Sequence, residues 1–382
     1  MQLKTKLSII ASSLIVASSL AAEDYVSVQF VQYDESDDRA SVSTPSIEFS
    51  KDFGVDYNLK LGLVADSISG GSPTWFDTTS GASAYSRGED IHKDDVAYGN
   101  VEYDDKRVAG SALFTTRFAS RDELAVGVNY SRETDYEARE LSAEYLYYLG
   151  SSKNQSLSLG LSYQFNNVLV ECIENEACDA NSGASQTLDV NVVSAEVGFT
   201  QILNQNSLAK ASIFYSNEDG YLSNPYMNVV RSYNPNSSIV DVVAENKPDT
   251  RVSYGATLQY IVALTDQISS NSTYRFYDDD WDIMSHTISS ELYYELGRSW
   301  ILGAGLRYYT QSEAKFYRAG YFGDEMYASS DERMRDFDAW GYKINADYLI
   351  TNALSVNVGL NFYDQQDTFN ATYYNIGLKY NF

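Results

Sequence analysis

Beyond its first two dozen residues, the chain has no apolar run approaching the roughly 18 to 20 residues that a membrane-spanning helix needs. Its mean hydropathy is −0.34, so a helical membrane protein is excluded. Proline is also scarce, with 5 in 382 residues, as expected where most backbone N–H groups must donate to a sheet. These absences favour a chain built mainly of β-strands.

Cysteine and histidine are nearly absent too, with two residues of each: Cys172, Cys178, His92 and His286. In an oxidising compartment, two cysteines so close in sequence are most simply a disulfide that closes one small loop. A metal site is the weaker alternative, because the segment between the cysteines contains no histidine and neither histidine is nearby in sequence. We therefore expect no metal site and no cofactor.

Positive charge is in short supply, and the net charge is −26. This makes nucleic acid an improbable partner, because a phosphate backbone is met by basic surfaces. The acidic residues gather in runs that could bind divalent cations, which also bridge lipopolysaccharide, or could bias a pore toward cations. Alternatively they are solvated loop tips, and none has the spacing of a calcium-binding loop. The runs are Asp34, Glu35, Asp37 and Asp38; Glu89, Asp90, Asp94 and Asp95; Glu171, Glu174 and Glu176; and Asp278, Asp279, Asp280 and Asp282.

The first residues have the layout of a cleavable secretory signal. Lys4 and Lys6 precede an apolar run over 7–20 that ends in small residues, and we expect cleavage after Ala21 or Ala22. No cysteine stands at this junction to carry a lipid. The sequence thus predicts a signal peptide over 1–21 and one exported domain over 22–382, held in a membrane by its own fold.

The strongest pattern is a period of two in segments of about ten residues. Leu157, Leu159 and Leu161, for example, alternate with small polar residues, so one face of each strand is apolar and the other polar. A soluble sandwich also alternates, but it seldom keeps the second face so rich in Gly, Ser and Asn. The fold class we predict is therefore all-β: a transmembrane, antiparallel, up-and-down β-barrel of about 16 strands. The 33 tyrosines suit its two interfacial girdles.

The connections between these segments alternate between short and long, as in barrels with periplasmic turns and extracellular loops. The longest, 68–105, could fold into the lumen and constrict it or could extend outward, and the sequence favours neither. The expected strands are 25–34, 42–52, 55–67, 106–118, 123–133, 137–149, 155–167, 187–201, 207–217, 250–263, 267–277, 282–296, 299–311, 335–349, 353–363 and 370–382.

The last expected strand ends in Phe382, which resembles the carboxy-terminal signal read by the barrel-insertion machinery. An ordinary closing strand is the alternative. The expected partners are thus outer-membrane lipid, lipopolysaccharide and that machinery, in the outer membrane of a Gram-negative bacterium. A homo-oligomer is possible for a porin of this size, but no interface can be identified.

Charges of both signs fall on the predicted lumen face. They could form a transverse field for small solutes, or could pair across a closed interior and rigidify it. The sequence leaves both open. These residues are Lys60, Arg107, Arg117, Glu144, Arg251, Arg275, Glu291, Arg307, Lys343, Asp347 and Lys379.

Nothing in the chain favours enzymatic catalysis. His286 is predicted to face lipid, where a Ser–His pair would suit a phospholipase. Ser285, however, alternates to the opposite face, and no Gly-x-Ser-x-Gly motif is present. A histidine at the aqueous rim making one hydrogen bond is the simpler interpretation, and we expect no enzyme.

Several segments resemble a family of uncharacterised Gram-negative proteins, catalogued as a domain of unknown function and regarded as outer-membrane barrels. The chain departs from that pattern at Gly71, where the family has Ala, and at 313–315, where it has Ala-Ala-Asp. The resembling segments are 26–35 (VSVQFVQYDE), 66–73 (DSISGGSP), 104–110 (DDKRVAG), 245–251 (ENKPDTR), 274–287 (YRFYDDDWDIMSHT), 306–317 (LRYYTQSEAKFY) and 331–333 (DER).

The resemblance implies the fold and the location but no activity. Its polar segments fall at the extracellular strand ends and hint at a ligand site near the outer mouth. The alternative is that these residues pair with one another to order the loops. The candidates are Tyr277, Asp278, Asp279, Asp280, Trp281, Arg307, Tyr309, Gln311, Asp331 and Arg333.

Three functions remain for such a barrel. A porin-like channel for small solutes is the leading hypothesis, because a polar lumen and sixteen strands leave space for water. A closed or plugged barrel, serving as a surface scaffold or as a docking partner for exported proteins, is the alternative. An outer-membrane lipid hydrolase is the third.

Overall fold

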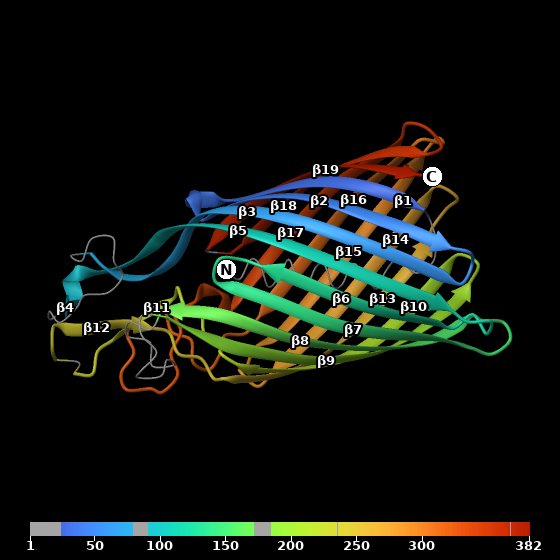
Figure 1. Ribbon diagram of the computed structural model, residues 1–382. Coiled ribbons are helices and arrows are strands. Elements are labelled where there is room, and N and C mark those ends of the chain that lie inside the picture. Colours follow the sequence, from blue (N-terminus) through green and yellow to red (C-terminus); the bar gives the residue numbers. More distant parts are fainter. Residues whose placement is uncertain (1–23, 79–90, 172–184, 235, 367) are drawn as a thin grey trace.

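The computed structural model describes residues 24–78, 91–171, 185–234, 236–366 and 368–382, and it has the predicted fold. Sixteen antiparallel strands close into an up-and-down barrel in the order β1-β19-β18-β17-β16-β15-β14-β13-β10-β9-β8-β7-β6-β5-β3-β2 (Figure 1). The barrel strands are β1 (Tyr25–Glu35), β2 (Ala40–Phe53), β3 (Tyr57–Asp77), β5 (Val96–Arg117), β6 (Glu123–Arg132), β7 (Tyr136–Leu149), β8 (Gln155–Glu171), β9 (Ser185–Asn204), β10 (Ser207–Gly220), β13 (Thr250–Ala263), β14 (Ile268–Asp279), β15 (Met284–Leu296), β16 (Trp300–Gln311), β17 (Phe337–Leu349), β18 (Leu354–Gln365) and β19 (Phe369–Asn381).

Helix is confined, among the described residues, to three short 3-10 turns: η1 (Ser36–Asp38), η2 (Lys93–Asp95) and η3 (Glu332–Met334). None of them is long and apolar enough to cross a membrane.

The alternation read from the sequence corresponds to the two faces of the barrel wall. On β8, Leu157, Leu159 and Leu161 are 39%, 48% and 54% exposed on the outside, whereas Ser156 is buried and Ser158 half-buried on the inside. Successive side chains of a strand point to opposite faces, so each strand contributes apolar groups outward and small polar groups inward. The outer surface is therefore apolar and the lumen polar.

The two ends of the barrel differ, as predicted. Tight turns join the strands at the end of the barrel where β1 begins and β19 ends, with Tyr25 opposite Asn381. In three of these turns Gly54, Gly150 and Gly297 take φ values of 68°, 65° and 67°, a left-handed conformation that costs glycine little. The long connections gather at the opposite end (Figure 1).

The segment 68–105 is not the loop that the sequence predicted. β3 and β5 remain paired far beyond the expected boundaries, from Tyr57 opposite Thr116 to Asp77 opposite Val96, and this ribbon projects past the rim of the barrel (Figure 1). Its described parts therefore do not fold into the lumen. The prediction failed because side chains that no longer alternate between lipid and water show no period-two pattern. The hydrogen-bonded pairing of the two strands nevertheless continues.

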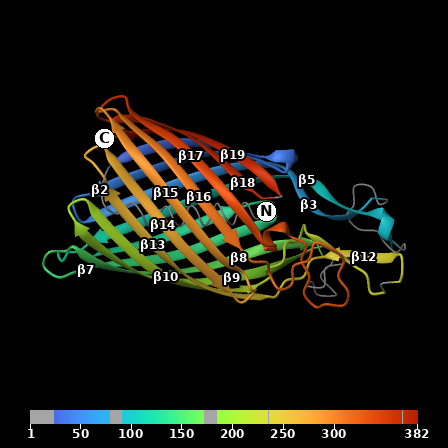
Figure 2. The same cartoon turned by 180° about the vertical axis from the view of Figure 1, so that it is seen from behind.

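The other long loops build a second structure at the same end (Figure 2). β11 (Asn228–Arg231), β12 (Ile239–Ala244) and β4 (Ile91–His92) form a small sheet with β12 in the middle. Together with residues 221–249 and 312–336 and the β14–β15 turn, this sheet makes up what we call the cap.

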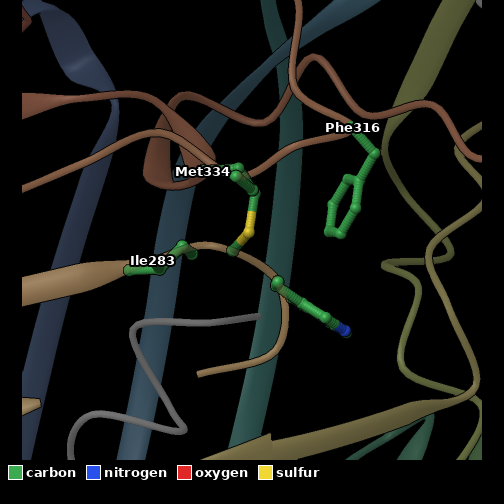
Figure 3. Packing of buried hydrophobic residues seen from close by; sticks show 5 residues of the cluster. Ile283, Phe316 and Met334 are labelled. Carbon is green, nitrogen blue, oxygen red and sulfur yellow. The ribbon is translucent and has the colours of Figure 1, made fainter. Parts of the chain in front are cut away.

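The cap has its own apolar clusters. Trp281, Ile283, Ala314, Phe316 and Met334 form one of them, with the rings of Trp281 and Phe316 edge to face at 5.0 Å. Figure 3 shows Met334 directed toward the segment that carries Ile283. A cluster of this kind holds loops in a fixed arrangement, because opening it would expose apolar surface to water.

Some predictions lie outside the described residues. These are the signal peptide over 1–21, the Cys172–Cys178 disulfide, and the acidic residues Glu89, Asp90, Glu174 and Glu176.

Candidate lumen site

A cavity of about 910 Å³ occupies the barrel beneath the cap. Its walls are inward-facing side chains of the strands, and cap residues such as Ser223, Lys247 and Arg333 form its outer end. The volume lies within the range typical of small-molecule sites. The lumen is thus not filled by its own side chains, and cap residues lie at its outer end.

The predicted lumen charges occupy inward-facing positions. Lys60, Arg107, Arg251 and Arg275 line the cavity itself. Arg117 lies nearer the turn end, with its guanidinium 3.5 Å from Asp52 Oδ1 and 3.9 Å from Glu123. Arg307, Lys379, Glu144 and Asp347 share the inward parity of their strands, as do Lys343 and Glu291.

Part of this charge is paired along the wall. Arg107 donates to Asp66, and both side chains are buried. Lys343 Nζ lies 3.1 Å from Glu291 Oε1 in a more open position. Arg107 and Asp66 are opposite each other on the paired strands β5 and β3. Glu291 on β15 and Lys343 on β17 reach each other across Gly305 of β16, so both pairs run along the wall and do not cross the lumen.

Below the cap, Arg251 on β13 is held by a carboxylate and two rings. Its Nε donates to Asp279 Oδ2 at 2.9 Å, and its guanidinium lies 4.5 Å from the centre of the Trp281 ring. The Tyr277 hydroxyl donates to the same Asp279 oxygen at 2.8 Å. The other carboxylate oxygen accepts from the backbone N–H groups of Trp281 and Ile283. Asp279 therefore joins the barrel wall to the cap.

Arg275 on β14 is held differently. Its guanidinium lies 4.9 Å from the centre of the Phe214 ring and 5.8 Å from that of Tyr277. The Tyr277 ring is also 5.8 Å from the guanidinium of Arg251, so it lies near two arginines. No carboxylate lies within ion-pair distance of Arg275 among the residues that the structure describes.

The structure brings six of the ten predicted mouth residues to the cavity or its edge. Tyr277, Trp281, Tyr309, Gln311 and Arg333 line it, and Arg307 lies 5.2 Å from the Tyr309 ring. Asp279 is buried behind them, and Asp331 is buried in the cap. Asp278 instead accepts from the Tyr254 hydroxyl on the outer face, and Asp280 accepts from Val252 N at 3.0 Å.

A buried ionic cluster, which sequence reasoning missed, connects the two main loops of the cap. Lys247 Nζ lies 2.8 Å from Glu245 Oε1 and 3.4 Å from Asp331 Oδ2, and Arg333 pairs with Asp331. Ser329 Oγ donates to Glu245 at 2.6 Å. Glu245 and Lys247 stand in the segment ENKPDTR, but nothing there signalled a partner 84 residues away.

The two carboxyl groups of this cluster respond differently to burial. Burial raises the pKa of Glu245 above its ordinary range, although Lys247 opposes the change. Burial would also raise the pKa of Asp331, but the positive charges of Arg333 and Lys247 outweigh that effect and hold it below its ordinary value.

Two further groups of titratable residues have local partners. Asp105, Glu133 and Asp135 place carboxylate oxygens within 4.8 Å of one another. Asp105 accepts from the Thr134 hydroxyl at 2.8 Å and Asp135 from that of Tyr226, so their proximity does not by itself indicate a bound ion. His286 Nδ1 lies 2.8 Å from the Tyr274 hydroxyl on the outer face.

A family model described as "Protein of unknown function (DUF3570)" matches residues 7–378. None of the curated proteins matches the chain. Among solved structures, it is similar to the "CymD monoaromatic hydrocarbon channel", with 8% identity, a TM-score of 0.45, and 95% of this chain and 89% of the other covered.

Two other solved structures are similar over most of this chain. The KdgM porin, solved with disordered oligogalacturonate, has 10% identity and a TM-score of 0.30, and the match covers 93% of this chain and 99% of KdgM. The siderophore receptor PirA from Acinetobacter baumannii has 10% identity and a TM-score of 0.46. That match covers 92% of this chain and 54% of PirA, so the chain spans about half the receptor's length.

Proposed function

The chain belongs to the DUF3570 family of proteins of unknown function, and on that premise we propose that it is an outer-membrane barrel that acts as a porin-like channel for small solutes. Export by a cleaved signal peptide and insertion by the barrel-assembly machinery are part of this proposal. The single observation that carries it is the cavity of about 910 Å³ inside a closed barrel, lined in part by charged and small polar residues.

The membrane location is supported by the outer surface. Large apolar side chains such as Leu258, Ile288, Leu306 and Ile344 are 47–57% exposed on β13, β15, β16 and β17, and soluble monomers rarely expose so many large apolar groups on one face. Closure pairs the backbone groups of every barrel strand with its neighbours, which is what lipid requires of a spanning sheet.

A solute route is supported by the inside of the barrel. A barrel that serves only as an anchor gains stability by filling its interior with packed side chains. Here glycine, serine and asparagine face a cavity, for example Gly62, Ser142 and Asn129. Such a wall offers small polar groups to water and polar solutes in the cavity.

Planar-bilayer recording tests the proposal. The mature chain, refolded and purified in detergent, is expected to give discrete current steps that are smaller than those of an open sixteen-strand porin, because the cap covers one end. Protein shown to be folded by its heat-modifiable migration on gels, yet giving no steps across a wide range of voltage, would reject a channel.

The cap favours a second candidate, a plugged barrel that presents a fixed surface to other proteins. Its buried clusters and the Lys247–Asp331 pair would make it a permanent closure rather than a gate. In that case neither the wild-type protein nor a variant with a loosened cap would conduct. Affinity purification from membranes should then recover a stoichiometric protein partner.

A further inference from the structure

We infer that Arg275 is the centre of a binding site for small organic anions bearing a carboxylate, set in the lumen wall beneath the cap. This inference deepens the proposed channel function and rests on it for its physiological meaning. It assigns the class of solute, and the binding itself can be measured without conduction.

The site is built from an aromatic pair that forms over a glycine. Phe214, Gly255 and Tyr277 are opposite one another on β10, β13 and β14. Because Gly255 has no side chain, the rings of Phe214 and Tyr277 meet across it, stacked with centroids 6.2 Å apart. A Cβ on Gly255 would lie 2.6 Å from the Phe214 ring and 2.2 Å from the carbonyl oxygen of Phe276, so the arrangement requires glycine.

This aromatic pair positions the guanidinium of Arg275. A guanidinium is planar, and stacking on rings engages its faces while leaving its N–H donors along the edge. Arg275 lies beside both rings, and its side chain is exposed to the cavity. The edge donors of this cavity-lining arginine are thus available to an anion in the lumen, in the fork geometry that matches a carboxylate.

Arg275 differs from three other lumen arginines in having no counter-charge within ion-pair distance, and Arg307, which has no described ion pair either, lies beside the Tyr309 ring. Arg107 is paired with Asp66, Arg117 with Asp52, and Arg251 with Asp279. Across the part of the chain that the structure describes, no carboxylate comes within ion-pair distance of Arg275. An uncompensated guanidinium facing a cavity of limited size attracts an anion, because the low-dielectric walls screen the charge less than bulk water does.

The surroundings favour an organic anion over a bare inorganic one. Tyr277, Tyr309, Trp281 and Phe337 line the same cavity, and they offer flat apolar surface close to the charge. Ser285 also faces it, hydrogen-bonded to Tyr309. A ligand with a carboxylate at one end and an apolar body would therefore use both features.

Isothermal titration of the detergent-solubilised barrel tests the inference, with benzoate as the probe, benzamide as its neutral counterpart and inorganic phosphate as the competing anion. Benzoate is expected to bind and benzamide to bind at least about tenfold more weakly, as the loss of a charge-assisted bidentate contact implies. Phosphate binding with no benzoate binding would overturn the assigned class.

Two variants and a control localise the site. R275Q is expected to weaken benzoate binding about tenfold or more, and R275K to weaken it by a smaller factor because lysine keeps the charge but not the fork. K343Q removes a lumen cation that is already paired with Glu291 and should bind as the wild type does. Unchanged affinity in R275Q, or in R275K, would overturn the inference.

The outcome is distinguishable from failure of the proposed function. A barrel that binds benzoate through Arg275 but carries no current would keep this site and reject the channel. A barrel that conducts, but in which R275Q and the wild type bind benzoate equally, would keep the channel and reject this site. Heat-modifiable migration on gels shows in each case that the variant is folded.

Discussion

Lys247 and Asp331 form a buried ion pair, with Nζ 3.4 Å from Oδ2, between two loops whose residues are 84 positions apart in the chain. Both side chains are almost inaccessible, at 1% and 3% exposure. Glu245, Arg333 and Ser329 complete the cluster. The pair thus fixes one half of the cap against the other, directly above the lumen cavity.

Replacing Lys247 with methionine should loosen the cap and leave the barrel intact. The change removes the cation from the buried Glu245 and leaves Asp331 with Arg333 alone, and breaking a buried pair in this way costs about 3–5 kcal/mol. We expect trypsin to cleave the cap of K247M under conditions in which both barrels stay folded and the wild-type cap stays intact. Hydrogen exchange should rise in residues 221–249 and 312–336, with little change in the barrel strands.

The matched control is K315M, which removes an exposed lysine side chain of the same cap that donates to the carbonyl of Asp280. It should behave as the wild type does. Equal protection of the cap in K247M and K315M would show that the ionic cluster contributes nothing to closure.

Acid should open the cap only at low pH. The pKa of Asp331 is depressed in the folded state, so its contribution to stability is present above its ordinary pKa of 3.8 and is lost as the pH falls through the lower folded value. Glu245, with its raised pKa, changes in the opposite sense: its protonation on acidification favours the folded cap, so it does not cause opening.

Pepsin digestion between pH 2 and pH 5 measures this dependence, since the protease is active throughout. The wild-type cap should resist cleavage at about pH 4 and become susceptible well below the ordinary pKa of aspartate. In D331N the cap should already be susceptible at about pH 5. A wild-type cap that pepsin already cleaves at about pH 5 would contradict the assignment of the two carboxyl groups.

The two kinds of lumen ion pair should differ in energy. Arg107 and Asp66 are 8% and 5% exposed, and R107M leaves the Asp66 charge buried, at a cost of about 3–5 kcal/mol. The Lys343 and Glu291 side chains are 39% and 30% exposed, so K343M should cost about 0–1 kcal/mol. Urea unfolding from lipid vesicles compares them, and equal losses would refute the difference in burial that we assign.

How much of the fold could be predicted from the sequence depends on the environment of each segment. Where strands separate lipid from water, as on β8, alternation predicted both the strand and its faces. Beyond the membrane that constraint ends, so the pairing of Trp75 with Tyr98 on the projecting ribbon left no period-two signal. The segment IVDVVA of β12 has β-branched residues typical of a strand, but it is so short that the sequence alone did not distinguish it from a loop.

The candidate site was predictable in part for the same reason. Tyr277, Tyr309 and Gln311 were candidates because the segments that carry them resemble the family, and because the polar residues of those segments fall at predicted strand ends. The role of Arg275 was not, because it depends on Phe214 reaching across Gly255 from another strand. Likewise the partners of Lys247 come together only through tertiary packing of two loops.

The central claim is that alternate residues face lipid and lumen around a closed barrel, and the pair L161R and S162R tests it most directly. Leu161 is 54% exposed on the outer face of β8, and Ser162 is its inward neighbour, opposite Ser142 and Ser194. In the free energy of unfolding from lipid vesicles, L161R should lose about 2–4 kcal/mol, the cost of arginine near the bilayer midplane. S162R should lose less than about 1 kcal/mol, since lumen positions carry no such cost. Equal losses, or a larger loss for S162R, would contradict the account.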